Sequence, residues 1–397
     1  MGKMKFNKKV WIAPEISETP ELDYNKIKAI YYNGMDYMGH KTRVFAYIGF
    51  PENASKNNKV PAIVLVHGGA GMAYPQWVEK WVEKGFAAIA MDLEGNVSNS
   101  PGSYYSSKQP YDESTGYIGG PSNNALDDSI TIIEDQWMYH AVSDVFLAYS
   151  LMSADERVNI NKIGVCGISW GGIITCIAIG NSDCFDFAIP IYGCAYIDES
   201  KSMLGGMSSG KIKGHAGSEW ITESSEWLKS SKIPTLWVNS DSDCAFSLDI
   251  TSRSAQDKPE SYMSIQPDLA HSHVDGWNVG ESYSFADSIV KSGRWTTKIT
   301  GQPTKDSRKV AFTMMPGAEI EKAYLIYRTD DIKYDIDDKS MFILADKWKQ
   351  KELMISDDII GFEVPDKAKM FYINLYDNQN NISSTHLVSV SIDNDID

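Results

Sequence analysis

Apolar stretches alternate with amphipathic ones through most of the chain. The run at 61–66 (PAIVLV) has no polar interruption, which is typical of a strand buried on both faces of a parallel sheet. A helical stretch with Trp77 and Trp81 on one side follows it and ends at Gly85, and a second apolar run occupies 86–91. Strand, helix and strand within about thirty residues indicate a right-handed parallel crossover unit.

The same alternation continues to about residue 295. Strands are expected at 26–32, 42–48, 61–66, 86–91, 163–166, 185–192, 235–238 and 262–266, and helices at 133–152, 219–228 and 281–291. Residues 1–25 read as irregular, since Pro14 and Pro20 interrupt them. This order of elements predicts an α/β domain with a mostly parallel sheet flanked by helices.

The pattern changes near Ser292, after which no long helical stretch follows. Short alternating runs at 309–314, 323–327, 370–375 and 387–392 lie between turn signals, at spacings typical of an all-β sandwich. A chain of 397 residues is also long for one domain. We therefore expect an N-terminal extension at 1–25, an α/β domain at 26–295 and a C-terminal β-sandwich domain at 296–397.

Two long insertions interrupt the α/β pattern, at 92–124 and 197–230. The first is rich in Gly and Pro and carries four tyrosines, Tyr104, Tyr105, Tyr111 and Tyr117. Loops of this length in a compact domain are usually lids or binding loops. A disordered surface insertion is the alternative, but so many aromatic residues favour an ordered segment. We expect both insertions to be lid elements.

The strongest chemical signal is the segment KIGVCGISWGGIITCIAIGN at 162–181. It predicts a buried strand, a very tight turn at Ser169 and a buried helix that ends at Gly180. The G-x-S-x-G spacing is that of a nucleophile elbow, in which glycines let neighbouring backbone pass close to a serine on a strained turn. Ser169 is therefore the candidate nucleophile.

The candidate acid and base follow Ser169 in the order that elbow chemistry requires, serine, acid and then histidine. The strand at 235–238 leads to Asp241 and Asp243, and the strand at 262–266 leads to His271 and His273. Both pairs stand at the carboxyl ends of strands, where open parallel sheets place their ligands. We prefer Asp243 and His271, with Asp241 and His273 as the alternatives.

These residues suggest a division of labour. His271 would accept the proton of Ser169 as attack begins, and Asp243 would orient the imidazole and stabilise its cation. The backbone N–H of Trp170 and one N–H from the loop Gly68-Gly69-Ala70 would hold the oxyanion. We expect His67 to support that loop through its ring rather than to exchange protons. No cofactor and no metal are expected.

These segments together resemble the α/β-hydrolases. The motifs are HGGAG at 67–71, GISWGG at 167–172, the turn at Asp243 and the HSH segment at 271–273. The nearest likeness is to the acetyl xylan esterase and prolyl oligopeptidase-like branch, because 42–47 (TRVFAY) and 137–141 (WMYHA) also resemble segments of bacterial acetyl xylan esterases. Two departures stand out: Ser240 replaces the usual Gly before the acid, and Ala70 replaces a frequent Gly.

The resemblance spans roughly residues 26–295, and the C-terminal segment resembles a β domain appended in those proteins. It implies a serine-dependent carboxylic ester hydrolase that acts through an acyl-enzyme and removes a small acyl group, such as acetate, from a carbohydrate or a similar small ester. The tyrosines at 104–117 fit that substrate, since flat aromatic faces suit sugar rings. A peptidase or acyl-aminoacyl peptidase is the alternative, because the same chemistry cleaves amides.

Net charge and apolar content limit the kinds of partner and the location that we expect for the protein. The formal charge of −16 argues against nucleic acid and anionic membrane surfaces, which are polyanions. No apolar run approaches the roughly 18 residues of a membrane helix, and the basic N-terminus has no apolar core of a signal peptide behind it. Five cysteines without C-x-x-C spacing fit reduced thiols, so a cytoplasmic location is expected. A homo-oligomer is left open.

Two other classes of function compete. His271 and His273 with Asp241 and Asp243 have the atoms of a zinc site, but that interpretation leaves the elbow unexplained. The chain could also be a non-catalytic carbohydrate- or peptide-binding protein on a hydrolase fold. All residue types of a catalytic triad are present, which favours an enzyme.

Overall fold

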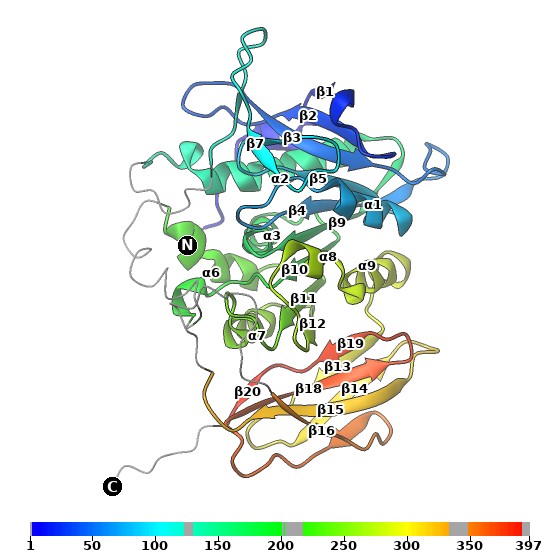
Figure 1. Ribbon diagram of the computed structural model, residues 1–397. Helices are drawn as coiled ribbons and strands as arrows, with labels where there is room; N and C mark the ends of the chain where they lie inside the picture. Colours follow the sequence, from blue (N-terminus) through cyan, green and yellow to red (C-terminus); the bar gives the residue numbers. More distant parts are fainter. Residues whose placement is uncertain (1, 123–129, 201, 203–216, 333–347, 391–397) are drawn as a thin grey trace.

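The computed structural model describes residues 2–122, 130–200, 202, 217–332 and 348–390. Its main sheet has the order β1-β2-β3-β5-β4-β9-β10-β11-β12, with β8 beside β3 (Figure 1). The strands are β1 (Ile16–Glu18), β2 (Lys28–Asn33), β3 (Thr42–Gly49), β4 (Val60–Val66), β5 (Ala87–Met91), β8 (Ile118–Gly119), β9 (Val158–Ile168), β10 (Phe187–Ile191), β11 (Thr235–Ser240) and β12 (Ser261–Gln266). From β5 to β12 all neighbours are parallel, whereas β1, β2 and β3 form an antiparallel end.

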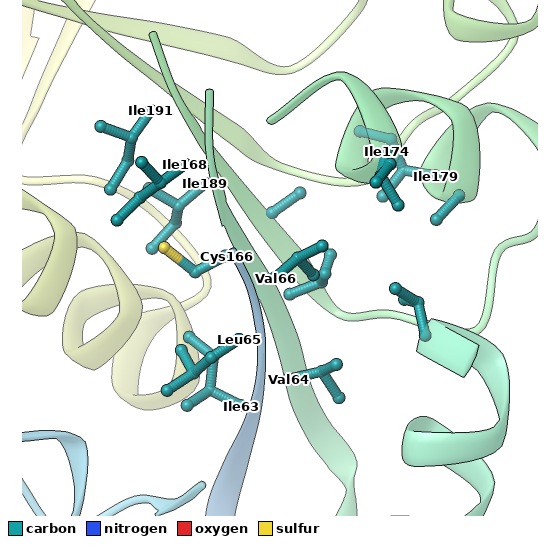
Figure 2. Close-up of a cluster of buried hydrophobic side chains, with 14 of the residues drawn as sticks. Ile63, Val64, Leu65, Val66, Cys166, Ile168, Ile174, Ile179, Ile189 and Ile191 are labelled. Atoms are coloured by element: carbon teal, nitrogen blue, oxygen red, sulfur yellow. The ribbon is translucent and has the colours of Figure 1, made fainter. Parts of the chain in front are cut away.

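Helices cover both faces of this sheet. One group is α1 (Pro75–Glu83), α8 (His273–Trp277) and α9 (Gly280–Ser292), and the other is α2 (Trp137–Ala154), α3 (Trp170–Asn181), α5 (Glu219–Thr222), α6 (Ser224–Lys229) and α7 (Leu248–Asp257). Figure 2 shows Leu65 and Cys166 on one side of the central strands, and Val64 on the other side with Ile174 and Ile179 of α3. Burial on both sides explains the uninterrupted apolar runs. The predicted α/β fold class is confirmed.

The C-terminal region is built from two antiparallel sheets. One contains β13 (Thr297–Gly301), β14 (Lys309–Met314) and β17 (Ile359–Gly361); the other contains β15 (Ile320–Arg328), β16 (Lys349–Glu352), β18 (Met370–Asp377), β19 (Ile382–Ser384) and β20 (Val388–Ser389). Apolar residues of both sheets share one core, among them Val310 and Phe312 from β14 and Leu325, Phe371 and Ile373 from the other sheet. This arrangement is the predicted β-sandwich. The domain bounds at 26–295 and 296–397 stay predictions.

The sandwich covers the open edge of the main sheet. Strand β19 lies beside β12, the last strand of that sheet (Figure 1). On the outer side of β12, the backbone groups of Ile265 bond to side chains instead of to a further strand. The Ile265 N–H donates to Ser384 Oγ at 2.7 Å, and the Ile265 carbonyl accepts from Asn374 Nδ2 at 2.9 Å. An uncovered edge strand invites pairing with other chains, and this contact prevents it.

Several elements were not expected from the sequence. The irregular N-terminal stretch contains 3₁₀ helices η1 (Lys8–Trp11) and η2 (Pro20–Leu22), and its strand β1 extends the sheet. Helices α7 and α8 were also missed. The helix predicted at 133–152 begins later, since η3 (Ile133–Asp135) precedes it, and the one predicted at 219–228 divides into α5 and α6.

The two insertions are only partly described. In the first, β6 (Asn96–Ser98) and β7 (Ser106–Lys108) form a small hairpin. The second insertion begins with the short 3₁₀ helix η4 (Ile197–Glu199). Of the expected lids, residues 123, 124, 201 and 203–216 lie outside the described residues, as does the end of the strand predicted at 387–392. Among the helices that are described, none is long and apolar enough to cross a membrane.

Candidate active site

Ser169 lies on a sharp turn between β9 and α3. Its backbone has φ 57° and ψ −119°, a conformation that costs a non-glycine residue about 1–3 kcal/mol. The flanking glycines make the turn sterically possible. A Cβ on Gly167 would lie 2.0 Å from the carbonyl oxygen of Gly171, and a Cβ on Gly171 would lie 2.0 Å from that of Val66. The spacing read from the sequence thus has the expected mechanical cause.

The structure brings Ser169, His271 and Asp243 into one hydrogen-bonded chain. His271 Nε2 lies 2.9 Å from Ser169 Oγ, and His271 Nδ1 lies 2.7 Å from Asp243 Oδ2. Ser169 follows β9, Asp243 lies in the turn after β11, and His271 lies in the loop after β12, so the carboxyl ends of three parallel strands supply the three groups. This geometry permits proton transfer from the hydroxyl to the imidazole, with the carboxylate fixing the tautomer.

Two aromatic rings hold His271 in place. Phe246 lies nearly parallel to the imidazole, at 11° with centroids 5.8 Å apart, and the ring of Tyr192 lies 4.5 Å from it. The Tyr192 hydroxyl donates to the carbonyl of Ser272, which anchors the histidine loop. Sequence reasoning missed both residues. Tyr192 could have been noticed because it follows the last residue of a strand, at the sheet edge that carries the site.

The two candidate acids have different surroundings. Asp243 Oδ1 accepts from the N–H groups of Ala245 at 2.8 Å and Phe246 at 2.7 Å, so the turn fixes its carboxylate. Asp241 instead accepts from the N–H of Asp268 at 3.0 Å. The contact with His271 therefore belongs to Asp243. Ser240, which replaces the usual Gly, accepts from the N–H of Ser242 at 3.2 Å and supports the turn.

The loop predicted to hold the oxyanion follows β4, and most of its amides already have acceptors. Gly68 N–H donates to His273 Nε2 at 2.9 Å, Ala70 N–H to Glu94 Oε1 at 3.2 Å and Gly71 N–H to the carbonyl of Gly68 at 3.0 Å. Within the described part of the chain, Gly69 N–H has no acceptor. Of the three predicted loop residues, Gly69 is the one whose N–H is available to a ligand.

Two neutral histidines support this loop. His67 Nδ1 donates to the carbonyl of Gly68 at 2.7 Å, and its Nε2 accepts from the N–H of Leu93 at 2.9 Å. Burial lowers the pKa of His67 to about 4. Burial, and then the neighbouring His67 and His271, lowers the pKa of His273 to about 3. His273 therefore stays neutral and can accept from Gly68, a role that the sequence did not reveal.

Hydrogen bonds join the first residues of the first insertion to the oxyanion loop. Asp92 is buried, and its Oδ1 accepts from the N–H groups of Glu94 at 2.9 Å and Asn96 at 2.7 Å. Burial raises the pKa of Asp92 to about 7. Because Leu93 binds His67 and Glu94 binds Ala70, the start of the insertion and the loop form one unit.

An aromatic row connects the site with the surface of the insertion. The ring of Tyr74 lies 5.0 Å from that of His273 and 6.2 Å from that of Tyr104, measured between centroids. Tyr104 is 54% exposed, whereas Tyr74 is buried. Tyr74 therefore lies between His273 and the exposed ring of Tyr104.

The residues of the alternative zinc site do not converge. Asp243 faces His271, Asp241 faces Asp268, and His273 faces Gly68. No group of three or more His, Cys, Asp or Glu side chains with the geometry of a metal site occurs among the described residues.

Part of the chain is similar in sequence to a known family, and similar solved structures also exist. Residues 44–218 match the model of the dienelactone hydrolase family. Similar solved structures include an acetyl xylan esterase from Paenibacillus sp. R4, with 15% identity, coverage of 67% of this chain and 90% of that chain, and a TM-score of 0.47. Another is the acylaminoacyl peptidase of Pyrococcus horikoshii, with 17% identity, coverage of 67% and 42%, and a TM-score of 0.48. No curated protein matches. The chain therefore has the α/β-hydrolase fold, and its residues 44–218 are similar to the dienelactone hydrolase family.

Proposed function

We propose that the protein is a serine esterase that removes a small acyl group, such as acetate, from a carbohydrate or a similar uncharged ester. The observation that carries the proposal is the chain of contacts from Ser169 Oγ through His271 to Asp243, at 2.9 and 2.7 Å. A hydroxyl held at a strained elbow beside an imidazole is the arrangement that activates a serine for acyl transfer.

In the proposed mechanism, Ser169 Oγ attacks the carbonyl carbon while its proton passes to His271 Nε2. The tetrahedral intermediate then collapses, and the leaving alcohol takes that proton as the C–O bond breaks. Water attacks the acyl-enzyme, gives a proton to His271 and releases the carboxylic acid, after which Ser169 recovers its proton. Asp243 stabilises the imidazolium in both steps.

The oxyanion is assigned to the N–H groups of Trp170 and Gly69. Trp170 is the first residue of α3, where backbone N–H groups have no partner within the helix and favour negative charge. Gly69 is chosen because the amides of Gly68 and Ala70 already donate to His273 and Glu94. Loss of one such donor usually costs about 10²–10³ in kcat.

The carbohydrate part of the proposal depends on Tyr104. Its exposed ring ends the aromatic row that begins at His273, so a sugar carrying the ester can stack on it while its acyl group reaches Ser169. We expect Tyr104→Ala to raise KM for an acetylated xylo-oligosaccharide and to leave KM for p-nitrophenyl acetate unchanged. Tyr105→Ala is the matched control, because Tyr105 is 77% exposed.

The reaction class is tested with a fluorophosphonate probe and two substrates. The probe should label the wild type and not Ser169→Ala, and p-nitrophenyl acetate should be hydrolysed faster than an aminoacyl anilide. Faster turnover of the anilide would replace the esterase by a peptidase. Absence of labelling, in a protein shown to be folded by its thermal transition, would instead indicate a binding protein.

A further inference from the structure

Asp241, the acid that does not face His271, joins three segments of the chain. It is 8% exposed and follows β11 directly. Its Oδ1 accepts from the N–H of Asp268 at 3.0 Å, and its Oδ2 accepts from the Tyr372 hydroxyl at 3.2 Å. Its backbone carbonyl accepts from Trp348 Nε1 at 2.7 Å. Tyr372 and Trp348 both belong to the C-terminal sandwich.

These contacts lie very near the catalytic chain. Asp243 comes two residues after Asp241, and Asp268 comes three residues before His271. The bond from Asp268 to Asp241 therefore ties the turn that carries the acid to the loop that carries the base. Together with the bond between Asp243 and His271, it closes a ring of two short segments and two hydrogen bonds. Neither segment can shift without disturbing both bonds.

The sandwich holds this ring from outside. Burial raises the pKa of Asp241, while the N–H of Asp268 and the Tyr372 hydroxyl lower it, so the charged form depends on both donors. Tyr372 is itself fixed, since it is fully buried on β18 and Trp348 packs edge-on against it at 5.3 Å. Without its donors a buried carboxylate would become protonated or turn toward solvent.

We propose that Asp241 is a positioning residue through which the C-terminal sandwich sets the distance between Asp243 and His271. The sandwich then supplies no group to the reaction, yet it controls the rate. This inference rests on the esterase function proposed for Ser169. It predicts that a single hydroxyl of the sandwich, that of Tyr372, affects kcat.

The first experiment compares two Tyr→Phe variants of the full chain with p-nitrophenyl acetate. Tyr372→Phe removes the donor to Asp241, and kcat should fall about tenfold with KM unchanged, because small displacements of catalytic groups cost rate and not ground-state binding. Tyr324→Phe is the matched control. It removes a hydroxyl from the same domain that makes no hydrogen bond to any described residue, and kcat should equal that of the wild type. Equal kcat values for the two variants would overturn the proposal.

A double-mutant cycle tests whether Tyr372 acts through Asp241. Asp241→Ala should lower kcat about a hundredfold, and adding Tyr372→Phe to it should lower kcat no further, because the hydroxyl then has no carboxylate to hold. Asp241→Asn keeps an acceptor for the N–H of Asp268 and should recover most of the loss. Independent, multiplicative effects of the two substitutions would contradict the coupling.

Hydrogen exchange provides a measurement that does not depend on activity. In Asp241→Ala, the peptide covering 266–272 should exchange faster than in the wild type, while a peptide within α3 should not change. Unchanged exchange at 266–272 would refute the role of Asp241. If the wild type neither labels nor hydrolyses esters, the proposed function fails, and exchange at this loop still decides whether Asp241 fixes it.

Discussion

The contact between His273 and the oxyanion loop can be tested by a substitution. The test distinguishes a His273 that supports the loop from a His273 that transfers protons. His273→Phe keeps a flat ring of similar size beside Tyr74 but removes the acceptor of the Gly68 N–H. Gly68 is buried, so the N–H would lose its partner without gaining water. An unsatisfied buried donor costs about 1–3 kcal/mol.

If that cost falls entirely on the transition state, kcat decreases about 5- to 150-fold, since each 1.36 kcal/mol is a factor of ten. The range lies well below the loss expected for removal of His271, the proposed base. His273→Gln offers a carbonyl acceptor to the same N–H and should recover part of the rate. A pH-independent ratio between variant and wild type is expected above about pH 5, because His273 is neutral there.

The assay is steady-state hydrolysis of p-nitrophenyl acetate by the wild type, His273→Phe, His273→Gln and His271→Ala. Thermal transitions of all four show whether each is folded. A kcat of His273→Phe equal to that of the wild type would mean that the bond to Gly68 is irrelevant to catalysis. A loss as complete as that of His271→Ala would mean that His273 takes part in proton transfer, against the assignment made here.

Three further changes test the site and its scaffold. Asp243→Asn should lower kcat by about 10⁴, as loss of a triad carboxylate does, whereas Asp241→Asn should cost far less; the reverse order in the same assay would exchange the two roles. Asp92→Asn should raise Tm more at pH 8 than at pH 4. The pKa of Asp92 is about 7 when folded and 3.8 in its ordinary state, so its buried charge destabilises the fold increasingly between those values, and a Tm difference independent of pH would refute this. Gly171→Ala should abolish folding or lower Tm strongly, while Gly280→Ala, whose Cβ meets nothing within 4 Å, should not; equal Tm values would disprove the crowding at the elbow.

The local features of the site could be predicted because each depends on a short stretch of sequence. The apolar runs at 61–66 and 163–166 specify strands buried on both faces. The glycines around Ser169 specify a turn that no other residues permit at those distances. Because parallel strands end at one edge of the sheet, residues that follow β11 and β12 are expected near Ser169. Asp243 and His271 could therefore be predicted as candidates.

Tertiary structure gives the two members of each pair different contacts. Asp241 and Asp243 are two residues apart on one turn, and their sequence neighbours do not distinguish them. Only packing does: the amides of Ala245 and Phe246 aim Asp243 at His271, while Asp268 and Tyr372 draw Asp241 away. In the same way, His271 and His273 differ because α8 begins at His273 and directs it to Gly68.

The sequence by itself determined the fold class, since periodicity and glycine spacing act over a few residues. It also predicted the candidate nucleophile and the strand ends from which the candidate acid and base come. It could not determine contacts between segments far apart in the chain, such as those of Leu93 with His67 or of Tyr372 with Asp241. Those bonds join residues that differ by 26 and 131 positions, and no local pattern encodes them. They arise only when the sheet has formed and the sandwich has covered its edge.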